Sequence, residues 1–240
     1  MKNLLLILIV WVITQTTALA QSSLEAQLLE NCKKELTDIS AKKVDIHDIA
    51  FNHDGHWLIL YGDIGYSYSY IPSPLENLLT KLNSAETPIN KAIMLSDTSW
   101  ALVYNGKEYT AQSLPTDIAT DIAAAQKKQK NLRCIAYKNG ERLTVYGTNG
   151  FIANGLPQKM VAKLAQLNKK KAPIRESAFY GTDGWVLLYG RTGMAFQGIP
   201  DDLSALLQKL GKKGTVVNLV RFFGDKWVVV YDGYKVESNI

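Results

Sequence analysis

The sequence predicts an α+β repeat protein: a closed toroid of five units, or α/β propeller, in which each unit is a three-stranded antiparallel meander plus one helix. A tyrosine recurs at spacings of 43, 42, 43 and 42 residues, with the same short pattern around each copy. Such a period is typical of solenoids, propellers and closed arrays. In addition, the last unit lacks a helix, whereas the chain begins with a helix that has no sheet. The anchors are Tyr61, Tyr104, Tyr146, Tyr189 and Tyr231.

Two strands are expected first in each unit. An apolar stretch, residues 46–51 in the first unit, is followed by a polar turn at residues 52–55 and then by the strand that carries the tyrosine. Turns of this kind between apolar runs indicate β-hairpins. The second strand is aliphatic throughout, which is typical of a strand covered on both faces. Four residues before the tyrosines stand Trp57, Trp100, Arg142, Trp185 and Trp227.

A third strand and a helix complete the unit. The strand follows a glycine-containing turn, as in residues 65–70 and 150–153. Eleven residues after each of the first four tyrosines stands a proline, and proline near the first helical position loses no needed N–H. The leucines that follow have the i, i+3, i+4, i+7 spacing of an amphipathic helix. In the first unit these are Leu75, Leu78, Leu79 and Leu82.

The two ends of the chain are expected to share one unit. The last unit stops at Ile240 without a helix, and residues 23–40 form an amphipathic stretch ahead of the first strand. A divided repeat predicts a ring closed by the N-terminal helix, because an open solenoid would carry a cap at each end. We therefore expect this helix to pack against the strand near Ile240. The single domain, 21–240, consists of units of about 44–88, 89–130, 131–173, 174–215 and 216–240, the last completed by 23–40.

The repeat also resembles a known type of sequence. Residues 184–193 read Gly-Trp-Val-Leu-Leu-Tyr-Gly-Arg-Thr-Gly, and Gly-Ile-Pro and a leucine-rich helix follow. Over about residues 44–240 such units resemble the tandem repeats of poorly characterised bacterial exported proteins. The five-fold arrangement is similar, in architecture alone, to the pentein type of α/β propeller. The resemblance implies no catalytic residue for this chain, because fold analogy does not carry activity.

The first 20 residues have the features of a signal peptide. Lys2 is positive, residues 4–13 are apolar, and small residues precede a cleavage site between Ala20 and Gln21. We expect an exported monomer, periplasmic or extracellular. The apolar run is shorter than the roughly 20 residues of a membrane span, so no transmembrane segment is expected in the mature chain.

Lysine pairs recur 19 and 18 residues before four of the tyrosines. In a ring they would share one edge and form a lysine crown, which could attract an anionic glycan, lipid headgroup or other envelope component. The alternative is that lysines at helix C-termini complement the helix dipole and solubilise the surface. Export and the lack of a nucleic-acid-binding motif argue against nucleic acid. The lysine crown comprises Lys42, Lys43, Lys127, Lys128, Lys170, Lys171, Lys212 and Lys213.

All three histidines lie in the first unit. His47, His53 and His56, together with Asp54, could hold a divalent metal at the hairpin tip through imidazole and carboxylate ligands. The alternative is that they are polar turn residues in solvent, because the turn at residues 181–184 has no histidine. No cofactor is otherwise expected.

Other departures from the repeat are candidate ligand-binding positions. Tyr68 and Tyr70 extend an aromatic run that could stack on a sugar, and Arg142 stands where the other units have tryptophan. Cys32 and Cys134 occupy positions that are apolar in other units, so we expect buried free thiols and not activated nucleophiles.

These observations predict an exported, non-enzymatic binding or interaction domain whose ligand or protein partner is unknown. It would bind through one edge or the central opening of the ring. One alternative is an enzyme with a central pocket, such as a metal-assisted hydrolase that uses the first-unit histidines and aspartates. Another is an envelope module that uses the lysine crown. Converging Asp, Glu, His or Lys side chains in a central pocket would favour the enzyme, and apolar packing there would favour the binding domain.

Overall fold

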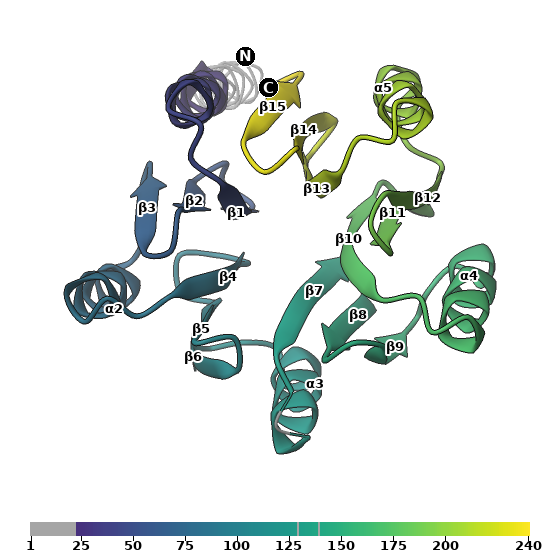
Figure 1. The fold of residues 1–240 in the computed structure, drawn as a ribbon. Helices are drawn as coiled ribbons and strands as arrows, with labels where there is room; N and C mark the ends of the chain where they lie inside the picture. Colours follow the sequence, from purple (N-terminus) through teal and green to yellow (C-terminus); the bar gives the residue numbers. More distant parts are fainter. Residues whose placement is uncertain (1–22, 129, 139) are drawn as a thin grey trace, which may run out of the picture.

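The computed structural model describes residues 23–128, 130–138 and 140–240 of the chain. It contains five three-stranded antiparallel sheets, each a meander in sequence order, and four of them are followed by a helix. The sheets are arranged about a common centre with the helices at the periphery (Figure 1). The predicted repeat of a three-stranded meander and a helix is thereby confirmed.

The strands fall into three sets by their place in the sheet. The inner strands are β1 (Ile46–Phe51), β4 (Ile89–Met94), β7 (Leu132–Lys138), β10 (Ile174–Tyr180) and β13 (Val217–Phe223). The middle strands are β2 (Trp57–Tyr61), β5 (Trp100–Tyr104), β8 (Glu141–Tyr146), β11 (Gly184–Tyr189) and β14 (Lys226–Tyr231). The outer strands are β3 (Gly65–Tyr68), β6 (Glu108–Gln112), β9 (Gly150–Asn154), β12 (Gly193–Gln197) and β15 (Lys235–Ser238).

The helices begin directly after the repeated prolines, which stand at the N-cap positions with extended backbone. Each helix buries its apolar face between two neighbouring sheets. In the fourth unit Leu203 and Leu207 pack with Val186 of β11 and Val229 of β14, and all four side chains are buried. The helices are α2 (Ser73–Ser84), α3 (Thr116–Lys127), α4 (Gln158–Lys169) and α5 (Asp201–Lys212).

An N-terminal helix, residues 23–41, packs in the same way on the last sheet. Cys32 and Leu36 are fully buried in a cluster that includes Val228 of β14 and reaches Ile240. The Lys33 ammonium donates a hydrogen bond to the Ile240 carbonyl oxygen at 3.0 Å. In Figure 1 this helix, in purple, lies beside β15. The expected contact between the first helix and the C-terminal strand is confirmed.

The first and last sheets also meet through their inner strands. β1 contacts β13, and the Ile46 amide donates to the Gly233 carbonyl at 2.8 Å. The Arg221 Nε donates to the Ile49 carbonyl at 2.9 Å. The chain ends are therefore joined by backbone as well as side-chain contacts.

Every inner strand contains a β-bulge near its start. In β1, Ile46 pairs with Tyr61 and Asp48 pairs with Leu60, so His47 is the extra residue. The third and fifth units also have hairpins one residue shorter than the others. Counting back from the tyrosine therefore misaligns these two inner strands by one residue. The bulge residues are His47, Asn90, Arg133, Arg175 and Asn218.

Candidate functional site

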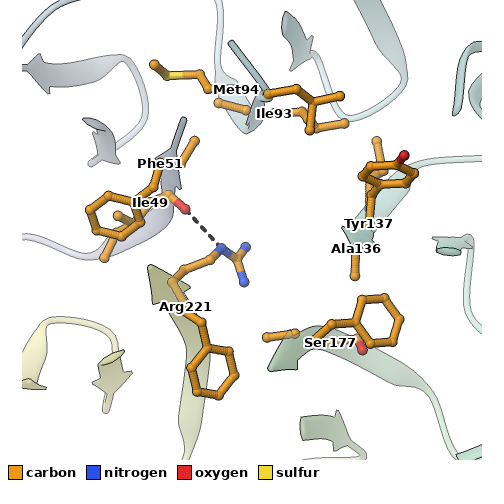
Figure 2. A pocket seen from close by; sticks show the side chains of 15 residues that line it. Ile49, Phe51, Ile93, Met94, Ala136, Tyr137, Ser177 and Arg221 are labelled. Carbon is orange, nitrogen blue, oxygen red and sulfur yellow. Dashed lines mark hydrogen bonds between the residues drawn. The ribbon is translucent and has the colours of Figure 1, made fainter. Parts of the chain in front are cut away.

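A cavity of about 150 Å³ lies at the centre of the five units, lined by the hairpin ends of the inner strands (Figure 2). Strand register places four aromatic residues and one methionine at equivalent positions around it, each paired with the tryptophan of the middle strand or, in the third unit, with Arg142. We call these five residues the aromatic collar. The collar consists of Phe51, Met94, Tyr137, Phe179 and Phe222.

One position deeper, a single large side chain fills the centre. Three of the five equivalent residues are alanines, Ala50, Ala136 and Ala178, and these leave room for Arg221 from β13. Figure 2 shows the guanidinium projecting between the strands, hydrogen-bonded to the Ile49 carbonyl. It also donates through Nη1 to the Val220 carbonyl at 2.9 Å. The protein therefore holds one arginine at the base of the cavity in a fixed orientation.

Beneath the cavity lies a layer that contains charged residues from three different units. Register places Asp48, Lys91, Cys134, Glu176 and Leu219 at one position of the five inner strands, directly after the bulge. We call the ionised residues Asp48, Lys91 and Glu176, together with Arg221, the axial charge cluster. Asp48 and Glu176 are almost fully buried, at 1 and 2 % exposure.

The axial charge cluster is internally paired. The Lys91 Nζ donates to Glu176 Oε2 at 2.5 Å and lies 3.9 Å from Asp48 Oδ1. The Arg221 Nη2 pairs with Asp48 and lies 3.3 Å from Glu176 Oε2. Backbone amides of Ala92 and Ser177 donate to the same two carboxylates, at 3.0 and 3.1 Å. Two anions and two cations leave the cluster with a formal charge of zero.

Ion pairing keeps Glu176, Lys91 and Arg221 in their ionised forms. Burial alone would raise the pKa of Glu176, but Arg221 and Lys91 outweigh it and lower that pKa to about 2. Burial would lower the pKa of Lys91 and of Arg221, whereas the Asp48 and Glu176 carboxylates raise both. All three groups are therefore charged at neutral pH.

Cys134 shares this layer, and its expected place at a position that is apolar in other units is correct for one unit only. Spacing from the tyrosine aligns it with Ile49 and Leu219; the register confirms Leu219, but the shorter hairpin of the third unit places Cys134 level with Asp48 and Glu176 instead of Ile49. Its Sγ donates to the Ser177 carbonyl at 3.7 Å. Burial, followed by the Glu176 charge, raises the pKa of the thiol well above its usual value. Both cysteines are buried and free, as expected, and such a thiol is a poor nucleophile at neutral pH.

The cavity therefore combines the two arrangements that were expected to distinguish enzyme from binding domain. Charged side chains do converge at the centre. However, the Asp48 and Glu176 carboxylates lie under the cavity and are already paired with Lys91 and Arg221. The lining side chains are apolar or aromatic apart from Ser177 and Arg221, although Tyr137 carries a hydroxyl group and the backbone adds polar surface. This arrangement can recognise an apolar or planar group with one hydrogen-bond acceptor.

The lysine crown is exposed and lies at the helix ends, away from the central cavity. Lys128, Lys170 and Lys213 are the C-cap residues of their helices, where positive charge complements the helix dipole. The Lys128 Nζ lies 5.2 Å from the centroid of the Tyr146 ring, a cation–π geometry. Lys128, Lys170 and Lys213 therefore have a local structural role, and an anionic partner for the lysine crown stays a prediction.

The histidines do not come together. His47 is at the start of β1, whereas His53 and His56 lie beyond its other end. His53 contacts the Leu95 carbonyl at 3.1 Å and Asp54 at 3.2 Å. Among the described residues no group of three or more His, Cys, Asp or Glu side chains could hold a metal. The proposed metal site at the hairpin tip thus receives no support from these contacts.

Tyr68 and Tyr70 contact other residues of the first unit. The Tyr68 hydroxyl donates to Glu76 of α2 at 2.5 Å, and its ring stacks on Tyr66. Tyr70 is 49 % exposed and contacts the His56 ring, with centroids 5.0 Å apart. The two tyrosines therefore do not form a shared platform with the central cavity.

Arg142 replaces tryptophan for a reason visible in α3. Its Nη1 donates to Asp117 at 2.7 Å and its Nε to Asp121 at 2.9 Å. In the fifth unit the Trp227 indole N–H donates instead to Asp202, the equivalent of Asp117. Asp121 stands where α5 has an apolar leucine, and it is 7 % exposed. Arginine and the second aspartate are thus a matched exchange, and Arg142 is occupied by intramolecular ion pairs.

This exchange makes a testable prediction. Arg142→Trp alone should lower the free energy of unfolding by about 1–3 kcal/mol, because it leaves Asp121 buried without its partner. Combining it with Asp121→Leu should restore most of the loss, which a double-mutant cycle in urea measures as a coupling energy. If the two losses were simply additive, the exchange would not explain Arg142.

Sequence reasoning missed Arg221 and the charged layer as a site. A signal was present: Asp48, Lys91 and Glu176 each stand 13 residues before a tyrosine, inside an otherwise apolar strand. Periodic charge in covered strands indicates that these side chains meet, because equivalent positions of a five-unit ring face one axis. Arg221 carries no such signal, since its equivalents are small or apolar.

No known protein family and no curated protein sequence matches this chain. Within the described ranges, no helix is long and apolar enough to cross a membrane.

Proposed function

We propose that the chain is an exported, non-enzymatic binding domain, a closed five-unit toroid that holds a small planar group in its axial cavity. The observation that carries this proposal is the aromatic collar above the buried Arg221. The predicted signal peptide, on which the proposal of export rests, lies outside the described residues.

Closure is supported by the joining of the two ends. The N-terminal helix covers the last sheet as α2 to α5 cover the sheets that follow them. Arg221 links the fifth unit to Asp48 and Ile49 of the first, and to Glu176 of the fourth. A closed ring needs no end caps, because each sheet is covered by a neighbour.

The chemistry of the ligand follows from the hydrogen bonds that Arg221 already makes. A guanidinium has five N–H donors, and contacts to Ile49, Val220, Asp48 and Glu176 occupy four of them. One Nη1 donor is left for a ligand. Because the axial charge cluster is already neutral, this donor suits a neutral carbonyl or amide oxygen better than a second anion. The aromatic collar suits a flat apolar body.

The size of the cavity limits the bound group to about one ring. An engineered cavity of similar volume in another protein accepts benzene. The occupant is therefore one ring of a small molecule, or one side chain of a partner protein. The pairing of both carboxylates and the raised thiol pKa support binding over catalysis, because no unpaired general base or activated nucleophile faces the cavity.

Benzamide is the probe that tests the proposal, since it combines one ring with a neutral carbonyl. In NMR titrations the Met94 methyl group and the Arg221 Nε–H resonance should shift together with a Kd on the order of 1 mM, the range of small fragments. Ala136→Met should weaken binding at least about tenfold by filling the cavity. Ala153→Met, at an exposed position of β9, should leave it unchanged.

Two results would contradict this function. One is the absence of shifts at Met94 and Arg221 up to the solubility limit of benzamide. The other is equal binding by wild type and Ala136→Met, which would place the probe elsewhere. Benzoate provides a further comparison and should bind more weakly, because its charge adds to a cluster that is already balanced.

A further inference from the structure

The five bulge residues form a second polar position around the axis, at the opposite end of the inner strands from the cavity. A bulge directs one extra side chain away from the regular alternation of a strand and is common beside functional sites. All five bulge residues are polar or basic, like the axial charge cluster and unlike the apolar residues that precede them in each strand. The register therefore collects five hydrogen-bonding side chains at one end of the axis.

Two of the five have a structural task that arginine cannot perform. The Asn90 side-chain oxygen accepts from the Gly106 amide at 2.6 Å, and the Asn218 oxygen accepts from the Gly233 amide at 2.8 Å. Arginine has no acceptor. The requirements of the turn therefore explain asparagine at two bulges and leave Arg133 and Arg175 unexplained.

Arg175 has unused hydrogen-bonding capacity. Its Nη1 donates to the Val217 carbonyl at 2.8 Å. Its Nε and Nη2 are shielded from solvent and have no hydrogen-bond partner among the described residues. These two nitrogens form the edge of a guanidinium that binds an oxyanion through two parallel hydrogen bonds. Leaving such donors unpaired is costly, so the arrangement favours a bound acceptor.

Arg133 adds a second positive charge at the same level. β7 and β10 are contacting inner strands, and both arginines occupy the bulge next to the shared Cys134–Glu176 layer. Burial lowers the pKa of Arg175, the Glu176 charge raises it, and the Arg133 charge, the smallest of the three influences, lowers it. Neither guanidinium lies within ion-pair distance of a carboxylate in the part of the chain that the structure describes. Two neighbouring guanidinium groups, neither of them in an ion pair, match the negatively charged oxygens of a phosphate group.

We propose that Arg133 and Arg175 form a phosphate-binding site at the bulge end of the axis. Phosphate oxygens would accept from the Nε and Nη2 of Arg175, and the Arg133 guanidinium would close over the remaining oxygens. The phosphate comes either from free inorganic phosphate or from a phospholipid headgroup. This site is separate from the axial cavity and from the lysine crown.

Thermal unfolding in sodium phosphate, compared with sodium chloride of equal ionic strength, tests the site. A ligand that binds only the folded state raises Tm, and we expect a phosphate-specific rise of about 3 °C or more at about 20 mM. Arg133→Gln and Arg175→Gln should each reduce the rise below about 1 °C. Arg191→Gln removes an exposed charge of the same kind and should retain it. Arg133→Gln keeps the test valid if Arg175→Gln does not fold, because the Arg133 side chain makes no hydrogen bond to another described residue.

Sedimentation with vesicles distinguishes the two sources. Binding to phosphatidylglycerol but not phosphatidylcholine vesicles, lost in Arg133→Gln, would identify a headgroup; a rise in Tm with free phosphate alone would identify the inorganic ion. The proposal is overturned if wild type responds to neither. It is also overturned if Arg133→Gln and Arg175→Gln respond as wild type does. Benzamide binding in Arg133→Gln should be unchanged, so failure here is distinct from failure of the axial cavity.

Discussion

Replacing Arg221 by methionine is expected to lower the free energy of unfolding by about 3–5 kcal/mol, the cost of breaking a buried ion pair from one side. Methionine retains much of the volume but none of the donors. Asp48 would lose its arginine, Glu176 would keep only Lys91, and the Ile49 carbonyl would lose its hydrogen bond. Urea unfolding near pH 7 measures the loss.

The matched control is Arg191→Met, at an exposed turn position, which should cost less than about 0.5 kcal/mol. A loss below about 1 kcal/mol for Arg221→Met would contradict the role of this residue as the link between the fifth and first units. Neutralising the whole axial charge cluster at once makes a sharper contrast. Replacing all four residues by neutral side chains of similar size should cost less than Arg221→Met alone, because no unpaired charge is left buried.

The fold could be predicted because the same pattern of strands, turns and helix recurs along the chain. The tyrosine period, the hairpin turns and the proline-led leucine helices are local patterns, and each copy supports the others. Even the division of one unit between residues 23–40 and 216–240 follows from counting. The helices and strands of the structure could thus be predicted without knowing which residues contact one another.

The site was harder to predict because it depends on strand register, which decides the residues that face one another in neighbouring strands. Asp48, Lys91 and Glu176 keep a constant distance from the tyrosine, but a shorter hairpin displaces Cys134 by one residue and hides its place in the same layer. Arg221 enters the centre only because alanines face it from other units. Bulges and loop lengths, which composition and period do not report, decide which side chains meet at the axis.

Departures from the repeat were a useful but incomplete guide. Arg142 is a real departure, yet its partners in α3 account for it. The first-unit histidines also depart from the pattern without converging. Arg142 departs from the repeat in one unit and is paired with aspartates of the neighbouring helix. The charges that recur in covered strands instead form ion pairs between units.

Acid is expected to remove a large part of the stability through Glu176. Its pKa is lowered from 4.5 to about 2 in the folded protein, and one pKa unit corresponds to about 1.4 kcal/mol. The ionised carboxylate therefore contributes about 3 kcal/mol. Because the folded pKa is the lower one, this contribution is fully present above about pH 4.5 and is lost as the pH falls toward about 2.

Comparison with Glu176→Gln isolates this contribution from the titration of other carboxylates. The difference in free energy of unfolding between wild type and Glu176→Gln should shrink by about 2–3 kcal/mol between about pH 6 and about pH 2.5. Glu108→Gln, at an exposed position of β6, should give a difference that stays constant within about 0.5 kcal/mol. A pH-independent difference for Glu176→Gln would mean that Lys91 and Arg221 do not hold this carboxylate ionised. Because those cations belong to the second and fifth units, the same measurement reports whether units distant in sequence are coupled through the axis.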